Sequence, residues 1–288
     1  MRVGFVGVGR LGAAMAQCAL NEGHGVVVFD VDQAATSALA ERGAEVAESP
    51  RLLAERCEIA AVVVLNDEQV REVVCGESGL LAAEGGADRI VIHSTIQLPT
   101  LAEVETAARS AGRILIDAGV SGSVAGAVEG ELAVMVGGEE EAILGFRPLL
   151  EIYGGLVVRV GGLGAGMKAK VARNLISFGQ CAAAYEGMRV AEEAGVDLAS
   201  FARIVRHSEN LSGMVDGYLS MPTVRPADSD SKSDRQRLAE APYIVSMAEK
   251  DLTAAIELGR ALGLDLPVAS AARDEAPATW GGEPGPKV

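Results

Sequence analysis

The feature that most constrains the fold is a glycine-rich turn at the very start of the chain. The short apolar run Val3–Val6 is followed at once by Gly7–Gly12 (Gly-Val-Gly-Arg-Leu-Gly) and then by the helix-forming stretch 13–16. Strand, glycine turn and helix in this order predict a dinucleotide site, with the pyrophosphate held at the helix N-terminus. The three glycines would serve the tight turn, the approach of the pyrophosphate and the packing of helix on strand.

An acidic residue at the expected distance strengthens this prediction. A second apolar run, Gly25–Phe29, ends in Asp30, 18 residues beyond Gly12 (30 − 12). The carboxylate that binds the adenosine ribose hydroxyls is expected about 20 residues on. Asp30 would repel a 2′-phosphate, and no Arg or Lys directly follows it, so we expect NAD to be preferred, with NADP possible. The alternative is an ordinary turn before a core helix.

The pattern of the chain changes near residue 162. Before it, apolar strands alternate with helical patterns, which is typical of a parallel sheet covered on both faces. We expect strands at 3–6, 25–29, 59–65, 90–93, 114–117, 132–136 and 156–160, and helices at 68–74 and 100–110. Later helices are expected at 168–194, 197–206, 243–262 and 268–274. The predicted fold is α/β, a doubly wound parallel Rossmann sheet over residues 1–161 and an all-α domain over 162–288.

Two segments are expected to be loosely ordered. The stretch Pro226–Arg237 is polar and has few apolar residues, so we interpret it as a mobile loop. The tail from Pro277 onward is rich in glycine and proline and is expected to be poorly ordered. No internal repeat is visible.

Composition and charge disfavour several functional classes. The net charge of −15 disfavours nucleic acid and anionic membranes as partners, and an anionic substrate would need a local basic pocket. No apolar run reaches the roughly 18 residues of a membrane helix. The first strand begins directly after Arg2, which leaves no room for a signal peptide. Three separated histidines and four scattered cysteines predict no metal site and a reduced, cytoplasmic location; the cysteines are Cys18, Cys57, Cys75 and Cys181.

A second glycine-rich turn carries the best candidate for chemistry. Gly164 and Gly166 precede a helix on which Lys170 and Asn174 are four residues apart. The glycines would let the backbone come close to a ligand, and the spacing puts both side chains on one helix face. An ammonium and an amide side by side can bind and protonate a small oxygen-bearing substrate. The alternative is a lysine and an asparagine on a solvated face.

Several loop residues follow the carboxyl ends of the expected strands, where doubly wound sheets bind their ligands. Leu65, Asn66 and Thr95 lie at such ends. The longest segment is Asp117–Gly130, whose small residues and N–H groups suit a small carboxylate. The alternative for this segment is a flexible glycine-rich connection.

Taken in order, four blocks of the chain resemble the β-hydroxyacid dehydrogenase family. This family includes 3-hydroxyisobutyrate dehydrogenases, tartronate semialdehyde reductases and 6-phosphogluconate dehydrogenases. The resemblance covers residues 1 to about 276. It implies that Lys170 is the catalytic general acid and base and Asn174 its substrate-binding partner. It also implies that Lys250, in the block Lys250-Asp251-Leu252, lies near the nicotinamide and the substrate; without the resemblance, Lys250 would be a helix-surface lysine.

The expected function is hydride transfer between NAD(P) and a small β-hydroxy acid or its semialdehyde, in a homodimer or homotetramer. The expected catalytic residues are Lys170 and Asn174. The expected cofactor contacts are Gly7, Val8, Gly9, Arg10, Leu11, Gly12, Asp30, Leu65, Asn66, Thr95 and Lys250. The expected substrate contacts are Ser121, Gly122, Ser123, Lys170, Asn174 and Lys250. The alternatives are an imine reductase and a catalytically silent NAD(P)-binding interaction protein, and Lys170 argues against both.

The chain departs from the family pattern at three positions. Gly119 replaces a proline, which is expected to loosen the loop, and Ser123 replaces a glycine, which adds a hydroxymethyl group where substrate should lie. Arg173 stands where a second asparagine is common. These departures leave the dehydrogenase interpretation unchanged and the substrate open.

Overall fold

The computed structural model describes residues 1–193, 195–208, 220–221, 227–228, 230–261, 263 and 265–280. The chain divides into two compact units, Met1–Lys170 and Val171–Val288. The domain boundary expected from the sequence, between residues 161 and 162, lies nine residues earlier (170 − 161) and remains a prediction.

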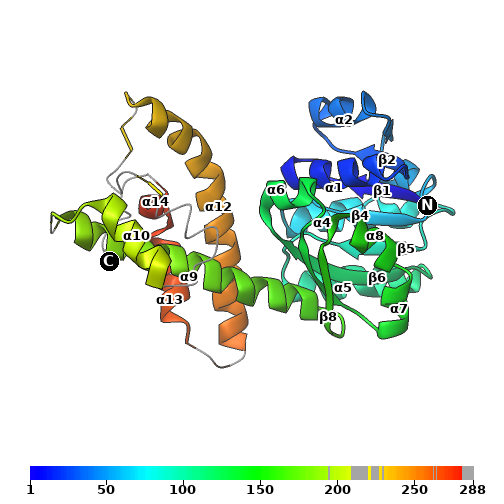
Figure 1. Cartoon of the computed structure of the whole chain (residues 1–288). Helices are drawn as coiled ribbons and strands as arrows, with labels where there is room; N and C mark the ends of the chain where they lie inside the picture. The colour runs from blue at the N-terminus through cyan, green and yellow to red at the C-terminus, as the bar shows by residue number, and fades with distance from the viewer. Residues whose placement is uncertain are drawn as a thin grey trace. The chain divides into compact units, whose positions relative to one another are not determined.

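The first unit contains a sheet with helices packed on it (Figure 1). The sheet has eight strands in the order β3-β2-β1-β4-β5-β6-β7-β8. Its strands are β1 (Arg2–Val6), β2 (Gly25–Phe29), β3 (Glu45–Val46), β4 (Ile59–Val62), β5 (Arg89–Ile92), β6 (Ile114–Ser121), β7 (Ala133–Gly137) and β8 (Leu156–Gly161). Its helices are α1 (Arg10–Asn21), α2 (Gln33–Ala40), α3 (Pro50–Ala54), α4 (Asp67–Cys75), the 3₁₀ helix η1 (Leu80–Ala82), α5 (Leu98–Ser110), α6 (Ser123–Val128), α7 (Glu140–Leu144) and α8 (Arg147–Tyr153). The predicted α/β class with a doubly wound sheet is confirmed.

The expectation of a wholly parallel sheet is corrected at one strand pair. Strands β1 to β6 pair in parallel, but β7 runs antiparallel to β6 and parallel to β8. Only residues 122–132 connect β6 to β7. A parallel crossover needs about a dozen residues or more, usually with a full helix, whereas a short connection returns the chain in the opposite direction.

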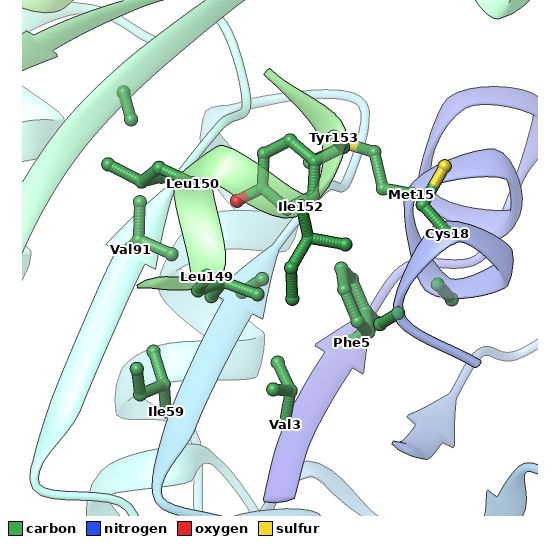
Figure 2. Packing of buried hydrophobic residues seen from close by; sticks show 14 of the residues in the cluster. Val3, Phe5, Met15, Cys18, Ile59, Val91, Leu149, Leu150, Ile152 and Tyr153 are labelled. Carbon is green, nitrogen blue, oxygen red and sulfur yellow. The ribbon is translucent and has the colours of Figure 1, made fainter. Parts of the chain in front are cut away.

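Strand alternation divides the apolar side chains of the sheet into two buried layers. Val3 and Phe5 of β1 face one layer, which Figure 2 shows packed on Met15 of α1 and on Leu149 and Tyr153 of α8. The neighbouring strand positions face the other layer, which is covered by apolar residues of α3, α4 and α5. Burying each such side chain fully contributes about 1.5–3 kcal/mol. Two covered faces therefore leave the strand ends as the places where ligands can reach the sheet.

The second unit is all-α in the part that the structure describes, as expected. Its helices are the continuation of α9 (Ala165–Glu193), then α10 (Leu198–Ser208), α12 (Lys232–Ala261), α13 (Pro267–Asp274) and α14 (Ala276–Thr279). Two apolar clusters hold them together, one around Cys181 and Trp280 and one around Phe178 and Leu252. Among all the described helices, none combines the length and the apolar character needed to cross a bilayer.

Both segments expected to be loosely ordered are partly helical. Lys232–Arg237 forms the first turns of α12, which the side chain of Ser231 caps by accepting a hydrogen bond from the Asp234 N–H at 3.4 Å. A polar composition does not prevent a helix, because Lys, Arg and Gln are good helix formers. Pro277 lies in the first turn of α14, and Trp280 directly after it is buried. Of these two segments, Pro226, Ser229 and residues 281–288 lie outside the described residues.

Candidate functional site

The first glycine of the N-terminal turn has a backbone conformation that favours glycine. Gly7 has φ +88°, and its N–H donates to the carbonyl oxygen of Phe29 at 2.9 Å. A Cβ at this position would lie 2.5 Å from the carbonyl oxygen of Val63. Glycine is therefore required for the chain to turn from β1 into α1 next to β4.

The other two glycines have different roles: Gly9 leaves space for a ligand, and Gly12 allows close packing. A Cβ on Gly9 would meet no atom within 4 Å, whereas a Cβ on Gly12 would collide with the carbonyl oxygen of Gly7. Gly9 is also the N-cap of α1, and no side chain caps the helix there. The open space at an uncapped helix N-terminus fits a pyrophosphate, since the first-turn N–H groups and the dipole favour an anion.

Asp30 lies beside this turn, at the end of β2. Its carboxylate accepts the N–H of Val8 at 2.7 Å and the N–H of Asp32 at 2.9 Å. A carboxylate has about four lone-pair positions, so two N–H bonds leave acceptors for ribose hydroxyls. The structure therefore brings together the glycine turn and the acid that the sequence paired with it, and these residues fit an adenine dinucleotide.

The other predicted cofactor residues of the first unit follow β4 and β5. Leu65 is exposed, and Asn66 is the N-cap of α4, with its side chain accepting the N–H of Gln69 at 2.9 Å. Ser94 accepts the N–H of Val64 at 2.9 Å and so ties the ends of the two strands together. The half-buried Thr95 comes next. A contact of Leu65, Asn66 or Thr95 with the cofactor remains a prediction.

The predicted substrate loop is mostly regular structure, which corrects the expectation of a glycine-rich loop. Strand β6 continues through Ser121, with Gly119 paired to Met135 of β7, and α6 begins at Ser123. Gly119 therefore does not loosen a loop. The antiparallel partner β7 supplies ladder hydrogen bonds to these residues, and a sequence pattern read as loop cannot reveal that partner.

The junction between β6 and α6 has an irregular backbone. Gly122 has φ +138°, and Ser123 has φ +64°, which is the single positive value among the described non-glycine residues. The left-handed conformation costs an L-residue about 1–2 kcal/mol. Ser123, the second departure from the family pattern, therefore keeps a side chain at a position that a glycine would occupy without strain.

Lys170 lies directly against strand β6. A Cβ on Gly119 would come within 2.6 Å of the Lys170 Cβ, so no side chain fits between the strand and the lysine stem. Residues 165–193 form one helix, which puts Lys170 and Asn174 one turn apart, as the spacing predicted. The third departure, Arg173, donates to the side-chain oxygen of Asn174 at 3.4 Å.

Two carboxylates anchor these residues, and sequence analysis assigned a role to neither. The buried Asp117 accepts the N–H groups of Gly164 at 2.6 Å and Met167 at 2.7 Å, at the start of α9. In the second unit, the Asn174 amide nitrogen donates to the buried Asp251 at 2.5 Å. Lys250 Nζ lies 3.4 Å from the other Asp251 oxygen, so Asp251 joins two of the predicted site residues.

Burial raises the pKa of Asp117, and the helix N–H groups that it accepts oppose this effect. Burial also lowers the pKa of the Arg173 guanidinium. The predicted substrate residues supply cations, amides and backbone donors, and the carboxylates of Asp117 and Asp251 hold parts of them in place. Among the described residues, no group of three or more His, Cys, Asp or Glu side chains could hold a metal ion.

Two family models match consecutive parts of the chain. The model for the NAD binding domain of 6-phosphogluconate dehydrogenase matches residues 2–162. The model for the NAD-binding region of NADP-dependent 3-hydroxyisobutyrate dehydrogenase matches residues 164–279. The two matches follow the order that the sequence blocks predicted.

Curated relatives cover nearly the whole chain. An uncharacterized oxidoreductase of Mycobacterium tuberculosis (strain ATCC 25618 / H37Rv) is 36% identical over 272 residues, 94% of this chain and 90% of the relative. The 3-hydroxyisobutyrate dehydrogenase of Pseudomonas aeruginosa is 31% identical over 272 residues, again 94% and 90%. The NAD-dependent L-serine dehydrogenase of the same species is 30% identical over 274 residues, 94% and 89%.

Solved structures agree with the relatives. The 3-hydroxyisobutyrate dehydrogenase of Salmonella typhimurium has a TM-score of 0.80 at 28% identity, covering 96% of this chain and 93% of its own. The Mycobacterium tuberculosis 3-hydroxyisobutyrate dehydrogenase with L-serine has a TM-score of 0.78 at 29% identity, covering 96% and 92%. An imine reductase from Myxococcus stipitatus, at 17% identity, TM-score 0.67 and coverage of 96% and 92%, shares the fold alone. The chain thus belongs to the β-hydroxyacid dehydrogenase family, as an NAD(P)-dependent oxidoreductase that acts on CH–OH groups.

Proposed function

We propose that the chain catalyses reversible hydride transfer between NAD and the alcohol of a short β-hydroxy acid, with Lys170 as the proton-transfer residue. The observation that carries the proposal is the position of Lys170 against Gly119, two residues before Ser121 on the same strand. Because strand side chains alternate, Gly119 and Ser121 lie on one face of β6. A short molecule held at Ser121 would therefore lie near the lysine.

3-Hydroxyisobutyrate and L-serine are the first candidate substrates. Relatives with 30% identity or more are named for these two compounds. Both carry a carboxylate and a hydroxymethyl group on one carbon, so one end is an anion and the other is the reacting oxygen. The corresponding semialdehydes would be the substrates in the reductive direction.

The acid–base step falls to Lys170. The Lys170 amine would take the hydroxyl proton during oxidation and return it to the carbonyl oxygen during reduction. A lysine does this near neutral pH only where burial or a nearby cation lowers its pKa. Lys170 is half-buried. The resemblance implies that Lys250 contacts cofactor and substrate, and we keep it as the candidate source of that cation.

The remaining residues would bind and orient. The N–H groups of Ser121, Gly122 and Ser123 would hold the substrate carboxylate, because a positive-φ junction can direct successive N–H groups to one anion. Asn174, whose amide is oriented by Asp251 and Arg173, would orient the reacting oxygen. Gly7–Gly12 and Asp30 would hold the dinucleotide, and the bound nicotinamide supplies the hydride chemistry.

Two rival functions stay open as alternatives, an imine reductase and a silent NAD(P)-binding protein. The resemblance associates both with the loss of the lysine at position 170, which this chain keeps. We also propose a cytoplasmic location, because the scattered spacing of the four cysteines is typical of a reducing compartment.

A matched pair of lysine variants tests the proposal. The purified chain is assayed with 3-hydroxyisobutyrate, L-serine, other small hydroxy acids and a cyclic imine, following the absorbance of reduced nicotinamide. Lys170→Ala should lower kcat about 10²–10⁴-fold on the best acid, the usual contribution of general acid–base catalysis. The control Lys168→Ala removes an exposed lysine two residues away and should leave kcat unchanged. Near-normal turnover by Lys170→Ala, or turnover of the imine alone, would refute the proposal.

A further inference from the structure

The buried carboxylate of Asp117 belongs to a strand but caps a helix that begins almost fifty residues later. Its side chain is fully inaccessible, and its two oxygens accept backbone N–H groups at the helix start, Oδ1 from Gly164 at 2.6 Å and Oδ2 from Met167 at 2.7 Å. N–H groups at a helix start have no partner within the helix. Hydrogen bonds to an ionised acceptor are shorter and about twice as strong as neutral ones. Asp117 therefore fixes the start of α9 to β6.

Two glycines, Gly137 and Gly166, let the start of α9 pack closely against the strands because they have no side chains. A Cβ on Gly166 would lie 2.8 Å from the Asp117 carboxylate and would collide with the Met135 carbonyl oxygen. A Cβ on Gly137 would collide with the Asp117 carboxylate and lie 2.8 Å from the Gly166 N–H nitrogen. The Met167 side chain is buried in the apolar layer of the first unit. The first turn of α9 is thus held by strands on one side and by the core on the other.

The position of Lys170 follows from this anchor. Lys170 comes three residues after Met167, close to one helical turn, and its Cβ lies against Gly119. Strand side chains at alternate positions point to one face, so Asp117, Gly119 and Ser121 share a face of β6. Along that face, Asp117 caps the helix, Gly119 leaves room for the stem of the lysine, and Ser121 lies where we place the substrate carboxylate.

We propose that Asp117 is a positioning residue for catalysis. It sets the distance between the Lys170 amine and the substrate-binding end of β6 without touching the substrate. The inference rests on the proposed function of Lys170. A displacement of about 1 Å at a reacting group can cost roughly 10²-fold in rate, so a fixed helix start has a direct catalytic consequence.

The principal test is Asp117→Asn, which keeps the shape of the side chain but replaces one acceptor oxygen by a donor. One of the two backbone N–H groups then faces an NH₂ group and loses its partner. We expect kcat to fall about 10- to 100-fold, while KM for the hydroxy acid and the Kd of NADH change little. Hydrogen exchange at the Gly164 and Met167 amides should become faster.

Two further variants separate positioning from general destabilisation. Val91→Ala removes fully buried apolar volume from β5 in the same sheet, so Tm should fall while kcat is unchanged. Gly119→Ala keeps the Asp117 carboxylate but pushes the Lys170 stem away, so kcat should fall while the two amides stay protected. If Asp117→Asn does not fold, Gly119→Ala still tests whether the position of Lys170 determines kcat.

The outcomes discriminate between the two proposals. Wild-type kcat in either Asp117→Asn or Gly119→Ala, at full NADH binding, would overturn the positioning role. A kcat loss in Val91→Ala equal to that of Asp117→Asn at a matched fall in Tm would also overturn it, since the effect would then be general instability. Normal turnover by Lys170→Ala refutes the proposed function instead, and the amide exchange of Asp117→Asn still decides whether Asp117 holds the helix.

Discussion

Asp30 is the residue whose contacts bear most directly on the choice of cofactor. Its carboxylate is held at the end of β2 by the N–H groups of Val8 and Asp32, and a 2′-phosphate placed there would be repelled. We expect the enzyme to prefer NAD, and Asp30→Asn to reduce the ratio of kcat/KM for NAD over NADP at least about tenfold, equivalent to 1.4 kcal/mol. The control is Glu41→Gln, which removes the charge of an exposed residue directly after α2. Faster turnover of the wild type with NADP at equal subsaturating concentration would contradict the prediction.

Single residues are predictable from sequence where a local pattern marks them. Asp30 stands at a set distance from the glycine turn, and Lys170 and Asn174 share a helix spacing, so all three could be singled out. The roles of Asp117 and Asp251 depend on partners 47 to 77 residues away, which no local pattern encodes. Their roles arise only in the packed structure.

At the scale of elements, a buried hydrogen-bonded pair, His93 and Tyr153, joins the end of β5 to α8. His93 Nδ1 lies 2.7 Å from the Ala118 carbonyl oxygen and therefore donates to it, so Nε2 accepts the Tyr153 hydroxyl at 2.8 Å. Burial lowers the pKa of His93 to about 4. The unfolded chain, with a histidine pKa near 6.5, binds the proton more readily than the folded chain. The stability that neutral His93 contributes is therefore complete above pH 6.5 and is lost as the pH falls toward 4.

The expected size of this effect is about 3 kcal/mol, from a depression of roughly 2.5 pKa units at 1.36 kcal/mol each. Denaturant unfolding between pH 7 and pH 4 measures it, and His93→Gln removes the titrating group. The slope of stability against pH should be shallower in the variant. Equal slopes in the two proteins would show that His93 does not resist protonation in the folded state.

Most of the elements that the sequence missed are short. Strand β3 has two residues, and the helices α2, α3, α6, α7, α8 and α14 have four to eight, which is few for an apolar period to be visible. The long elements were found because four or more residues of strand or several helical turns repeat the pattern. Strand direction is a different property: apolar alternation is the same in parallel and antiparallel strands, so the reversal at β7 could not be predicted.

At the scale of the whole molecule, the order of the elements determines the fold class. The exposed apolar surface, in turn, indicates how copies of the chain associate. Exposed apolar side chains occur on the second unit, including Ile176 of α9, which is 62% exposed, and Val268 of α13, which is 61% exposed. A Cβ on Gly179, one turn after Ile176 on α9, would lie 3.3 Å from Val268 Cγ1, so α9 and α13 adjoin there. Large apolar side chains grouped on adjoining helices are typical of an interaction surface.

We therefore expect a homodimer or larger assembly formed through the helical unit, with Ile176 in the contact. Ile176→Glu places a charge in that contact, where burial without a partner is unfavourable, and should shift the protein toward monomer at micromolar concentration. The control Leu144→Glu alters an equally exposed residue, 63%, on α7 of the first unit and should leave the mass unchanged. Light scattering on wild type and both variants measures the shift. A monomeric wild type, or the same mass for wild type and Ile176→Glu, would contradict this assembly.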